Sequence, residues 1–353
     1  MSRVAIVFFN LGGPDSPSAV RPFLFNLFND PAIIDAPTPM RWLLAQFISR
    51  RRAPIARDIY RSLGGASTLV ANTEVQARAL EAALTGSASD QAFKVFIAMR
   101  YWHPMSQAVA AAVKAWGPDR IVLLPLYPQY STTTTGSSLD DWKAAARRAG
   151  LKAPTVSVCC YPRQAGFAAE VAARVRPALE QARAQGVAAG ATRSPRVLFS
   201  AHGLPKKIVE RGDPYQWQVE RTAEAVVNAL AVDWLDWTVC YQSKVGRLEW
   251  IGPSTVDEIA RAGVDGVPLV VVPIAFVSEH SETLVELDLE YAALARQRGV
   301  PTYVRVPTVD DGPRFIAGLA ALVRGALEGD RPVRSEAGGR ICPAAHGCCA
   351  QAA

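Results

Sequence analysis

The strongest constraint on the fold of this chain is a set of eight short apolar, β-branched runs separated by stretches with helical spacing. Several runs are apolar on both faces, as strands buried in a parallel sheet are. The stretches between them, such as TEVQARALEAAL and ERTAEAVVNAL, repeat apolar residues with a helical period. This alternation predicts parallel α/β units. The expected strands begin at Val4, Phe93, Ile121, Thr155, Arg196, Trp237, Leu269 and Thr302.

The last four runs repeat the first four. LLPLYPQYS is matched by VVPIAFVSEH, and VFFNLGGP is matched by VLFSAHGLP. The third run follows the second by 28 residues in the first half and by 32 in the second, and the fourth follows the third by 34 and 33. The second run follows the first by 89 residues in one half and by 41 in the other. We therefore expect two similar four-stranded domains, the first with an insertion of roughly 45 to 50 residues after its first strand.

The domain boundaries follow from this duplication. We expect an N-terminal domain over 1–153 with an insertion at about 30–72, and a C-terminal domain over 154–310. A helix at 311–330 and a cysteine-bearing tail at 331–353 complete the chain. The insertion contains MRWLLAQFISRRR, a helix that places four apolar residues near one another and ends in three arginines. This helix suits the lip of a cleft or a membrane surface, or packs on the core.

Composition narrows the function classes. No apolar run reaches the roughly 18 to 20 residues that cross a bilayer, and the N-terminus carries no signal-peptide cleavage pattern, so we expect a cytoplasmic protein. A net charge of +6 suits an anionic partner. The basic residues form no RNA-binding or helix-turn-helix pattern, which argues against nucleic acid. Neither GxGxxG nor GxxxxGK[ST] occurs, which argues against a nucleotide site.

Ligands of open α/β sheets bind beyond the carboxyl ends of the strands, so the segments that follow the strands are the candidates for chemistry. PQYSTTTTGSS follows the third run and is either an anion site at a helix start or an N-cap loop. FSAHGLP places His202 at the end of the fifth run. After the seventh run, Glu279, Glu282, Glu286 and Glu290 share one face of an expected helix. Carboxylates beside an imidazole can move protons or handle a divalent cation, although such a stripe is also common on solvated surfaces.

These segments together resemble the ferrochelatase family. VLFSAHGLPKKIVERGDPY is similar to the family signature, and FNLGGP, FNDPAII, RYWHP, PLYPQYSTTTTGSS, CYQSKVGRLEWIGP and PIAFVSEHSETLVELDLEY are similar to further family segments in family order. The resemblance covers about residues 8 to 310. It implies two Rossmann-like domains around a porphyrin cleft (the chelatase fold). It also implies a lyase that inserts Fe2+ into protoporphyrin IX to give protohaem, the last step of haem biosynthesis.

The resemblance also implies roles for individual residues. His202 corresponds to the active-site histidine, which accepts a pyrrole proton or meets the metal, and Glu282 corresponds to the acidic residue that faces it. Glu279, His280 and Glu286 correspond to an acidic path for metal or protons. The positions that match porphyrin-pocket, propionate and lip residues of the family are Leu11, Arg51, Arg52, Tyr60, Ser67, Tyr101, Trp250 and Phe276.

Two alternative functions stay open beside the insertion of Fe2+ into protoporphyrin IX. A related chelatase would act on another tetrapyrrole or metal, such as coproporphyrin or cobalt, and a porphyrin or haem carrier would bind without catalysis. The implied partners are protoporphyrin IX, Fe2+ and, transiently, an anionic membrane surface, which would make the protein peripheral on the inner membrane. Family members occur as monomers and as homodimers, and both states stay open here.

Three of the six cysteines lie in the tail segment ICPAAHGCC. In some ferrochelatases one internal and three C-terminal cysteines hold a 2Fe–2S cluster. The resemblance implies such a cofactor on Cys342, Cys348 and Cys349, with Cys159 or Cys160 as the fourth ligand. Structural zinc, with His346 as a further candidate ligand, and unligated reactive thiols are the alternatives. Cys240 lies in the middle of an apolar run and is expected to be a core thiol.

Overall fold

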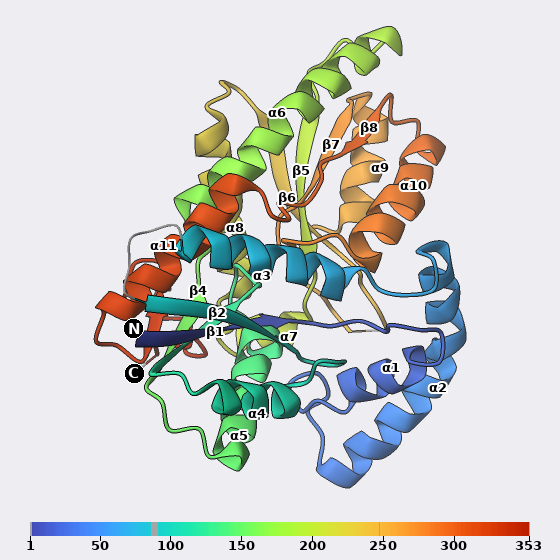
Figure 1. Cartoon of the computed structure of the whole chain (residues 1–353). Coiled ribbons are helices and arrows are strands. Elements are labelled where there is room, and N and C mark those ends of the chain that lie inside the picture. Colours follow the sequence, from blue (N-terminus) through green and yellow to red (C-terminus); the bar gives the residue numbers. More distant parts are fainter. Residues whose placement is uncertain (1, 86–90, 247, 353) are drawn as a thin grey trace. The chain divides into compact units, whose positions relative to one another are not determined.

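The chain folds into two compact units, each built on one parallel sheet flanked by helices (Figure 1). This computed structural model describes residues 2–85, 91–246 and 248–352, so residue 247 of the CYQSKVGRLEWIGP segment lies outside the description. The first unit comprises the described residues up to 160 together with 319–341, and the second comprises 161–318 together with 342–352. The predicted α/β class with two parallel sheets is therefore confirmed.

The sheet of the first unit has the strand order β2-β1-β3-β4-β9. Four of its strands are those expected from the apolar runs, whereas β9 comes from the segment expected to be a tail and was not predicted. β9 pairs in parallel with β4 at Ser157↔Val333 and Cys160↔Ser335. The strands are β1 (Ser2–Asn10), β2 (Gln91–Met99), β3 (Arg120–Pro125), β4 (Thr155–Cys160) and β9 (Val333–Ser335).

The sheet of the second unit has the order β6-β5-β7-β8, and all its pairings are parallel. Strand for strand, this is the order β2-β1-β3-β4 of the first unit, so the duplication seen in the sequence extends to topology. The strands are β5 (Arg196–His202), β6 (Asp236–Gln242), β7 (Leu269–Pro273) and β8 (Tyr303–Arg305).

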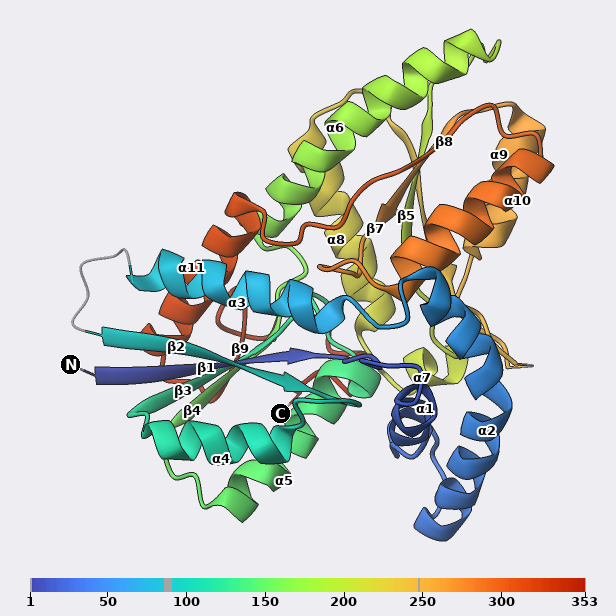
Figure 2. The same cartoon turned by 45° about the vertical axis from the view of Figure 1, so that its right-hand side comes forward.

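Helices cover both faces of the first sheet (Figures 1 and 2). Successive side chains of a strand point to opposite faces. Ala5, Val7 and Phe9 therefore face one side together, where they join Val113 and Trp142 in one buried cluster. The other face lies under α3. The helices around this sheet are α3 (Leu69–Thr85), α4 (Ser106–Trp116), a π-helical turn (Thr132–Gly136) and α5 (Ser137–Ala149).

The second sheet is covered in the same way. Leu198 and Val271 pack with Ile259 of α9 and Ala295 of α10, while α6 and α8 lie on the opposite face (Figure 2). The helix expected over 311–330 is α11, which matches closely. The elements are α6 (Ala165–Ala188), α7 (Lys206–Glu210), α8 (Tyr215–Leu230), α9 (Thr255–Asp265), a π-helix (Glu282–Tyr291) and α10 (Ala292–Gln297). They are followed by α11 (Pro313–Glu328), whose residues from 319 on belong to the first unit.

The segment that follows β1 forms α1 (Val20–Phe28) and α2 (Thr38–Ser62). The expected helix covers only the first half of α2, which continues through Pro54. Ala45, Ser49, Ala53 and Tyr60 form its buried stripe, and this stripe extends beyond the proline. Packing on the far side of Pro54 therefore offsets the backbone hydrogen bond that a proline removes.

The boundaries of the units differ from the expected ones. β4 belongs to the first sheet, so the first unit ends its long segment at residue 160 and not at 153. Residues 319–341 return to that unit, whereas 342–352, which carry the three tail cysteines, cluster with the second unit. None of the helices in the described part of the chain is long and apolar enough to span a membrane.

Candidate active site

The candidate site of the second unit lies at the carboxyl ends of three adjacent strands. β5 ends at His202, Ser243 directly follows β6, and the segment after β7 leads to Glu282. Because the carboxyl ends of parallel strands meet at one edge of the sheet, these side chains converge although they are far apart in sequence.

His202 faces Glu282 with a ring nitrogen able to accept a proton. Its Nδ1 lies 2.6 Å from the carbonyl oxygen of Gly203, and a carbonyl can only accept a hydrogen bond. Nδ1 therefore carries a hydrogen, and in the neutral ring Nε2 is the nitrogen with the lone pair. Nε2 lies 3.9 Å from Glu282 Oε1, and the two side chains are 39% and 25% exposed. The hydroxyl of Tyr215 holds the backbone here by donating to the carbonyl of His202 at 3.0 Å.

The acidic stripe lies on a π-helix, not on the expected α-helix. A π-helix closes hydrogen bonds from i to i+5 and is frequent at functional sites. Tyr291, five residues after Glu286, donates its hydroxyl to Glu286 Oε1 at 2.8 Å. Glu282 and Glu286 both reach Ser243, whereas Glu290 is exposed. The predicted face is therefore confirmed for Glu282 and Glu286 and wrong for Glu290.

Four donors converge on Glu286. Ser243 donates its backbone N–H to Oε1 at 2.9 Å and its hydroxyl to Oε2 at 2.5 Å. Gln242 donates to Oε2 at 3.1 Å, and Tyr291 supplies the fourth bond. Burial nevertheless raises the pKa of Glu286, and the neighbouring charge of Glu282 adds to the increase. This carboxyl group is thus firmly held and is a better proton acceptor than an exposed glutamate.

Glu279 has a different environment. Arg305 donates to Glu279 Oε1 at 2.5 Å and the backbone N–H of Thr308 donates to the same atom at 2.9 Å. Burial works to raise the pKa of Glu279, but the charge of Arg305 and these hydrogen bonds outweigh it and lower the pKa. Arg305 also binds both oxygens of Asp288 at 2.6 Å. Glu279 is therefore a carboxylate anion paired with the Arg305 cation. Glu286 differs, because its hydrogen-bond donors are neutral groups.

The remaining predicted residues of this unit surround the same edge. Burial lowers the pKa of His280, which keeps its ring neutral, and the ring of Phe276 lies 4.6 Å away. The ring of Trp250 lies 6.2 Å from that of His202. A Cβ on Gly203 would lie 2.9 Å from the Trp250 ring, so only glycine permits this approach.

Four predicted porphyrin residues are close together in the first unit. Leu11, Tyr60 and Tyr101 belong to one apolar cluster. A Cβ on Gly13 would lie 2.5 Å from Cβ of Ser67 and 3.8 Å from the Tyr60 hydroxyl. The paired glycines after β1 thus permit a close approach of the backbone to these side chains.

Tyr101 is 1% exposed, and its hydroxyl is already engaged. It donates to Asp30 Oδ2 at 2.8 Å, and Arg100 donates to the same oxygen at 2.8 Å. Ser137 also donates to it, and burial raises the pKa of Tyr101 well above its usual range. The hydroxyl of Tyr101 is therefore not available to a ligand.

Arg51 and Arg52 are exposed on α2. Arg52 lies over the ring of Phe28, 5.9 Å from its centroid. The structure thus places both arginines on the surface of the inserted segment.

The six cysteines form no disulfide bond among the described residues. Cys159 and Cys160 end β4 with their Sγ atoms 3.4 Å apart. In the second unit, Cys342 accepts a hydrogen bond from Gln218 at 3.1 Å, and the N–H of Cys348 donates to the carbonyl of Gly212 at 3.1 Å. Within the described residues, no group of three or more Cys, His, Asp or Glu side chains has the arrangement of a metal site.

Cys240 is fully buried and accepts a hydrogen bond from Thr255 at 3.3 Å. Burial raises the pKa of its thiol to about 12. The expected core thiol is confirmed by this environment.

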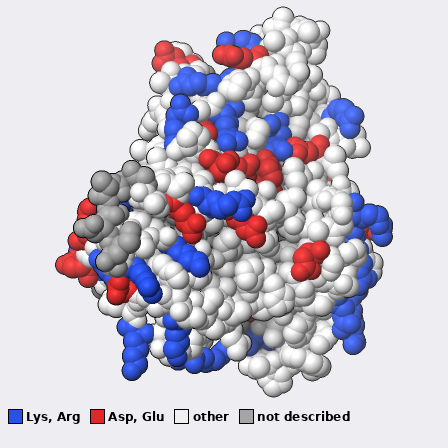
Figure 3. Space-filling view, viewed as in Figure 1, with Lys and Arg blue, Asp and Glu red and all other residues white. Residues whose placement is uncertain are grey.

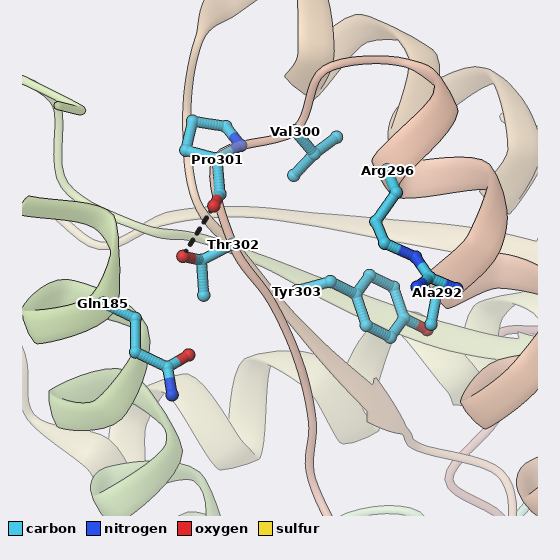
Figure 4. A pocket seen from close by; sticks show the side chains of 7 residues that line it. All are labelled: Gln185, Ala292, Arg296, Val300, Pro301, Thr302 and Tyr303. Atoms are coloured by element: carbon cyan, nitrogen blue, oxygen red, sulfur yellow. Dashed lines mark hydrogen bonds between the residues drawn. The ribbon is translucent and has the colours of Figure 1, made fainter. Parts of the chain in front are cut away.

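A pocket of about 300 Å³ opens at the other end of the second sheet (Figure 4). It lies beside the start of β8, whereas the candidate site lies at the carboxyl ends of β5, β6 and β7. In it, Thr302 donates to the carbonyl of Pro301 at 2.8 Å. The lining residues are Gln185, Ala292, Arg296, Val300, Pro301, Thr302 and Tyr303.

Several residues that shape the site were not predicted from the sequence. Gln242 and Ser243 hold Glu286, Arg305 holds Glu279, and Tyr291 completes the acidic group. Gln242 and Ser243 carried a usable signal, because they stand at the end of an apolar run in the same way as His202. Arg305, the last residue of β8, lay inside the apolar run predicted from the sequence, and Tyr291 ends the π-helix, so neither carried this signal.

The chain is similar to known ferrochelatases over most of its length. The ferrochelatase family model matches residues 3–327. Ferrochelatase of Phenylobacterium zucineum is 53% identical over 348 residues, which cover 99% of this chain and 98% of that protein. Ferrochelatase of Caulobacter vibrioides is 53% identical over 325 residues, which cover 92% and 90%.

Solved structures share the fold. SirB from Bacillus subtilis with Fe3+ aligns with a TM-score of 0.51 at 12% identity, covering 93% of this chain and 96% of that one. The sirohydrochlorin chelatase SirB in complex with cobalt aligns with a TM-score of 0.52 at 11% identity over the same shares of the two chains. At such identities the likeness concerns the fold alone. The family match and the curated relatives, in contrast, span nearly the whole length, and on these grounds the chain belongs to the ferrochelatase family.

Proposed function

We propose that this protein inserts Fe2+ into protoporphyrin IX to give protohaem, a lyase reaction that releases two protons. Family membership supports the reaction type. The observation that carries the proposal is the position of His202 at the carboxyl edge of the second sheet, where its Nε2 lies 3.9 Å from Glu282 Oε1.

The chemistry needs a base at the centre of the macrocycle. A neutral imidazole suits proton removal near pH 7, and Nε2 of His202 is the nitrogen with a free lone pair. Once protonated, the imidazolium stands beside the Glu282 carboxylate, which stabilises the charge and can take the proton. Trp250 and Phe276 supply flat apolar walls that can grip a macrocycle. Binding energy from such walls can offset the distortion that exposes the pyrrole lone pairs.

An anaerobic assay tests this function. Wild-type protein should convert protoporphyrin IX and Fe2+ to protohaem. His202→Ala should bind protoporphyrin but turn over at least about a hundredfold more slowly, because it lacks the proton acceptor. Wild-type protein that binds the porphyrin without metalating it would instead be a carrier. Coproporphyrin and Co2+ in parallel reactions decide between the two porphyrins and the two metals.

We also propose a 2Fe–2S cluster on Cys342, Cys348, Cys349 and one of Cys159 and Cys160. Four thiolates are the donor set that such a cluster uses. β9 pairs with the end of β4 at Cys160↔Ser335, and only six residues, 336–341, separate Ser335 from Cys342. The cluster would supply one-electron chemistry or a structural link, and no step of porphyrin metalation is assigned to it.

The visible spectrum of the purified protein, with iron and sulfide analysis, tests the cluster. Iron and sulfide in equal amounts, lost in Cys348→Ser, support it. Zinc without sulfide would favour a structural zinc site, and protein without either metal would leave the thiols unligated. Cys240→Ser is the matched control, because Cys240 is a core thiol and its replacement should leave the metal content unchanged.

We further propose that α2 contacts an anionic membrane surface. Its outer face exposes Leu43 and Phe47, each at 62%, and Trp42 at 47%. Lys and Arg side chains gather over the same helix, on the right-hand edge of Figure 3. Apolar residues flanked by cations bind the interface of anionic bilayers.

Sedimentation with vesicles containing phosphatidylserine tests this contact. Wild-type protein should bind, and Phe47→Glu should bind at least about tenfold more weakly because it brings a charge into the interface. Val264→Glu is the matched control, since Val264 is 89% exposed on α9 and should not contact lipid. Equal binding of all three proteins would refute the assignment to α2.

A further inference from the structure

Ser243 connects the two carboxyl groups of the acidic path. Its hydroxyl donates to Glu286 Oε2 at 2.5 Å and lies 3.4 Å from Glu282 Oε2. Two ionised carboxylates cannot both accept its single hydrogen. The short bond therefore goes to Glu286, and the longer distance to Glu282 leaves an oxygen lone pair of Ser243 facing that carboxylate.

We propose that Ser243 relays a proton from Glu282 to Glu286 during porphyrin metalation, an inference that rests on the function proposed above. When Glu282 has taken a proton, its O–H can donate to Ser243 Oγ. Ser243 Oγ then accepts this proton and, as its own O–H bond breaks, passes the hydrogen of that bond to Glu286. The step ends with Glu282 ionised, Ser243 again a hydroxyl and Glu286 neutral.

The relay answers a requirement of the reaction. Metalation releases two protons, and within the described residues the carboxylate that pairs with His202 Nε2 is that of Glu282. Passing the first proton to Glu286 returns Glu282 to its ionised form, which can receive the second. Glu279 is not suited to this role, because Arg305 binds it as an anion at 2.5 Å.

The backbone supports this placement. Ser243 has φ 64°, which is uncommon for a residue with a side chain. This conformation lets its N–H and its hydroxyl reach the two oxygens of the same carboxylate. The N–H bond does not depend on the side chain, so Glu286 stays in place when the hydroxyl is removed. The titratable groups that surround the carboxylate pair are His202, Tyr215, Glu279, His280, Tyr291 and Tyr303.

Single-turnover metalation under anaerobic conditions tests the relay in wild type, Ser243→Ala and Ser243→Gly. Glycine suits a positive φ, so Ser243→Gly removes the hydroxyl without backbone strain. Both variants should metalate at least about tenfold more slowly, with KM for protoporphyrin within about twofold and a larger solvent deuterium isotope effect. In both, the acidic limb of the pH–rate profile should move to higher pH, because a hydrogen bond that lowers the pKa of Glu286 is lost.

Val267→Ala is the matched control for lost stability. Val267 is fully buried just before β7, at the end of the sheet away from Ser243, so this change should lower Tm but leave the isotope effect unchanged. Rates within about twofold of wild type in both Ser243 variants would overturn the relay. A loss confined to KM would also overturn it and would place Ser243 on the substrate. A wild-type protein that fails to metalate protoporphyrin would refute the proposed function itself.

Discussion

Replacing Asp30 by alanine should destabilise the first unit strongly. Asp30 is 3% exposed and accepts hydrogen bonds from Arg100, Tyr101 and Ser137 on one oxygen. Removing one partner of a buried ion pair costs about 3–5 kcal/mol, because the other charge stays buried. Arg100 is 17% exposed and retains Asp141 at 3.8 Å, so we expect the lower end, about 3 kcal/mol. For a unit of this size, that corresponds to a fall in Tm of about 6–12 °C.

Thermal and urea unfolding of the full chain measure this loss. Asp58→Ala is the charge-matched control, because the Asp58–Arg61 pair is 68% and 76% exposed and such pairs contribute at most about 1 kcal/mol. Tyr101→Phe removes one hydrogen bond from the buried group and should cost about 1–2 kcal/mol. An Asp30→Ala protein that unfolds within about 1 °C of wild type would refute the reasoning. So would a protein that loses activity while keeping its full stability, since Asp30 would then act on the substrate.

Three further predictions follow from local geometry. Burial raises the pKa of Cys240 from 9.0 to about 12. Above pH 9 the unfolded state therefore loses this proton first, and stability should fall by up to about 1.4 kcal/mol per pH unit until the folded pKa is reached. Urea unfolding from pH 8 to 10 should show a shallower decline in Cys240→Ala, and equal slopes would contradict the assignment. Gly263→Ala should lose about 1–3 kcal/mol because its Cβ would lie 2.1 Å from the carbonyl oxygen of Arg298. In α11, no atom lies within 4 Å of the Cβ that Gly325→Ala would add, so this variant should gain about 0.5–1 kcal/mol of stability. Denaturant midpoints of the Gly263 and Gly325 variants that move in the same direction would refute the comparison. Gly203→Ala should displace Trp250 and weaken protoporphyrin binding in a fluorescence titration, whereas unchanged affinity would remove Trp250 from the porphyrin wall.

Sequence patterns were most informative where a single physical effect dominates. Buried parallel strands need continuous apolar runs, so eight strands and their duplication along the chain could be predicted from the pattern and spacing of these runs. His202 and Glu282 could be placed at the same edge because strands of a parallel sheet end together. The end of α2 could not be predicted, because Pro54 is a strong helix-stop signal and only tertiary packing of Tyr60 overrides it.

Features that depend on tertiary contacts could not be predicted from local sequence patterns. β9 has three residues, VRS, and none of the apolar character of the other strands. It is a strand because β4 offers an open edge. The π-helix likewise could not be predicted from the sequence, since the residues suit an α-helix and the wider turn is set by backbone hydrogen bonds from i to i+5. Arg305 was missed because a lone arginine in an apolar run gives no hint of the two carboxylates that it binds.

The pairing of β9 with β4 has a consequence for synthesis on the ribosome. The strands that meet at Cys160↔Ser335 are separated by 175 positions in the chain. At translation rates of about 5–20 residues per second, the edge of β4 emerges roughly 9–35 s before its last neighbour exists. An open strand edge is a template for pairing with other chains. The nascent protein therefore passes through an aggregation-sensitive interval that closes only when nearly the entire polypeptide has been made, and truncation before residue 333 should leave it permanently in that state.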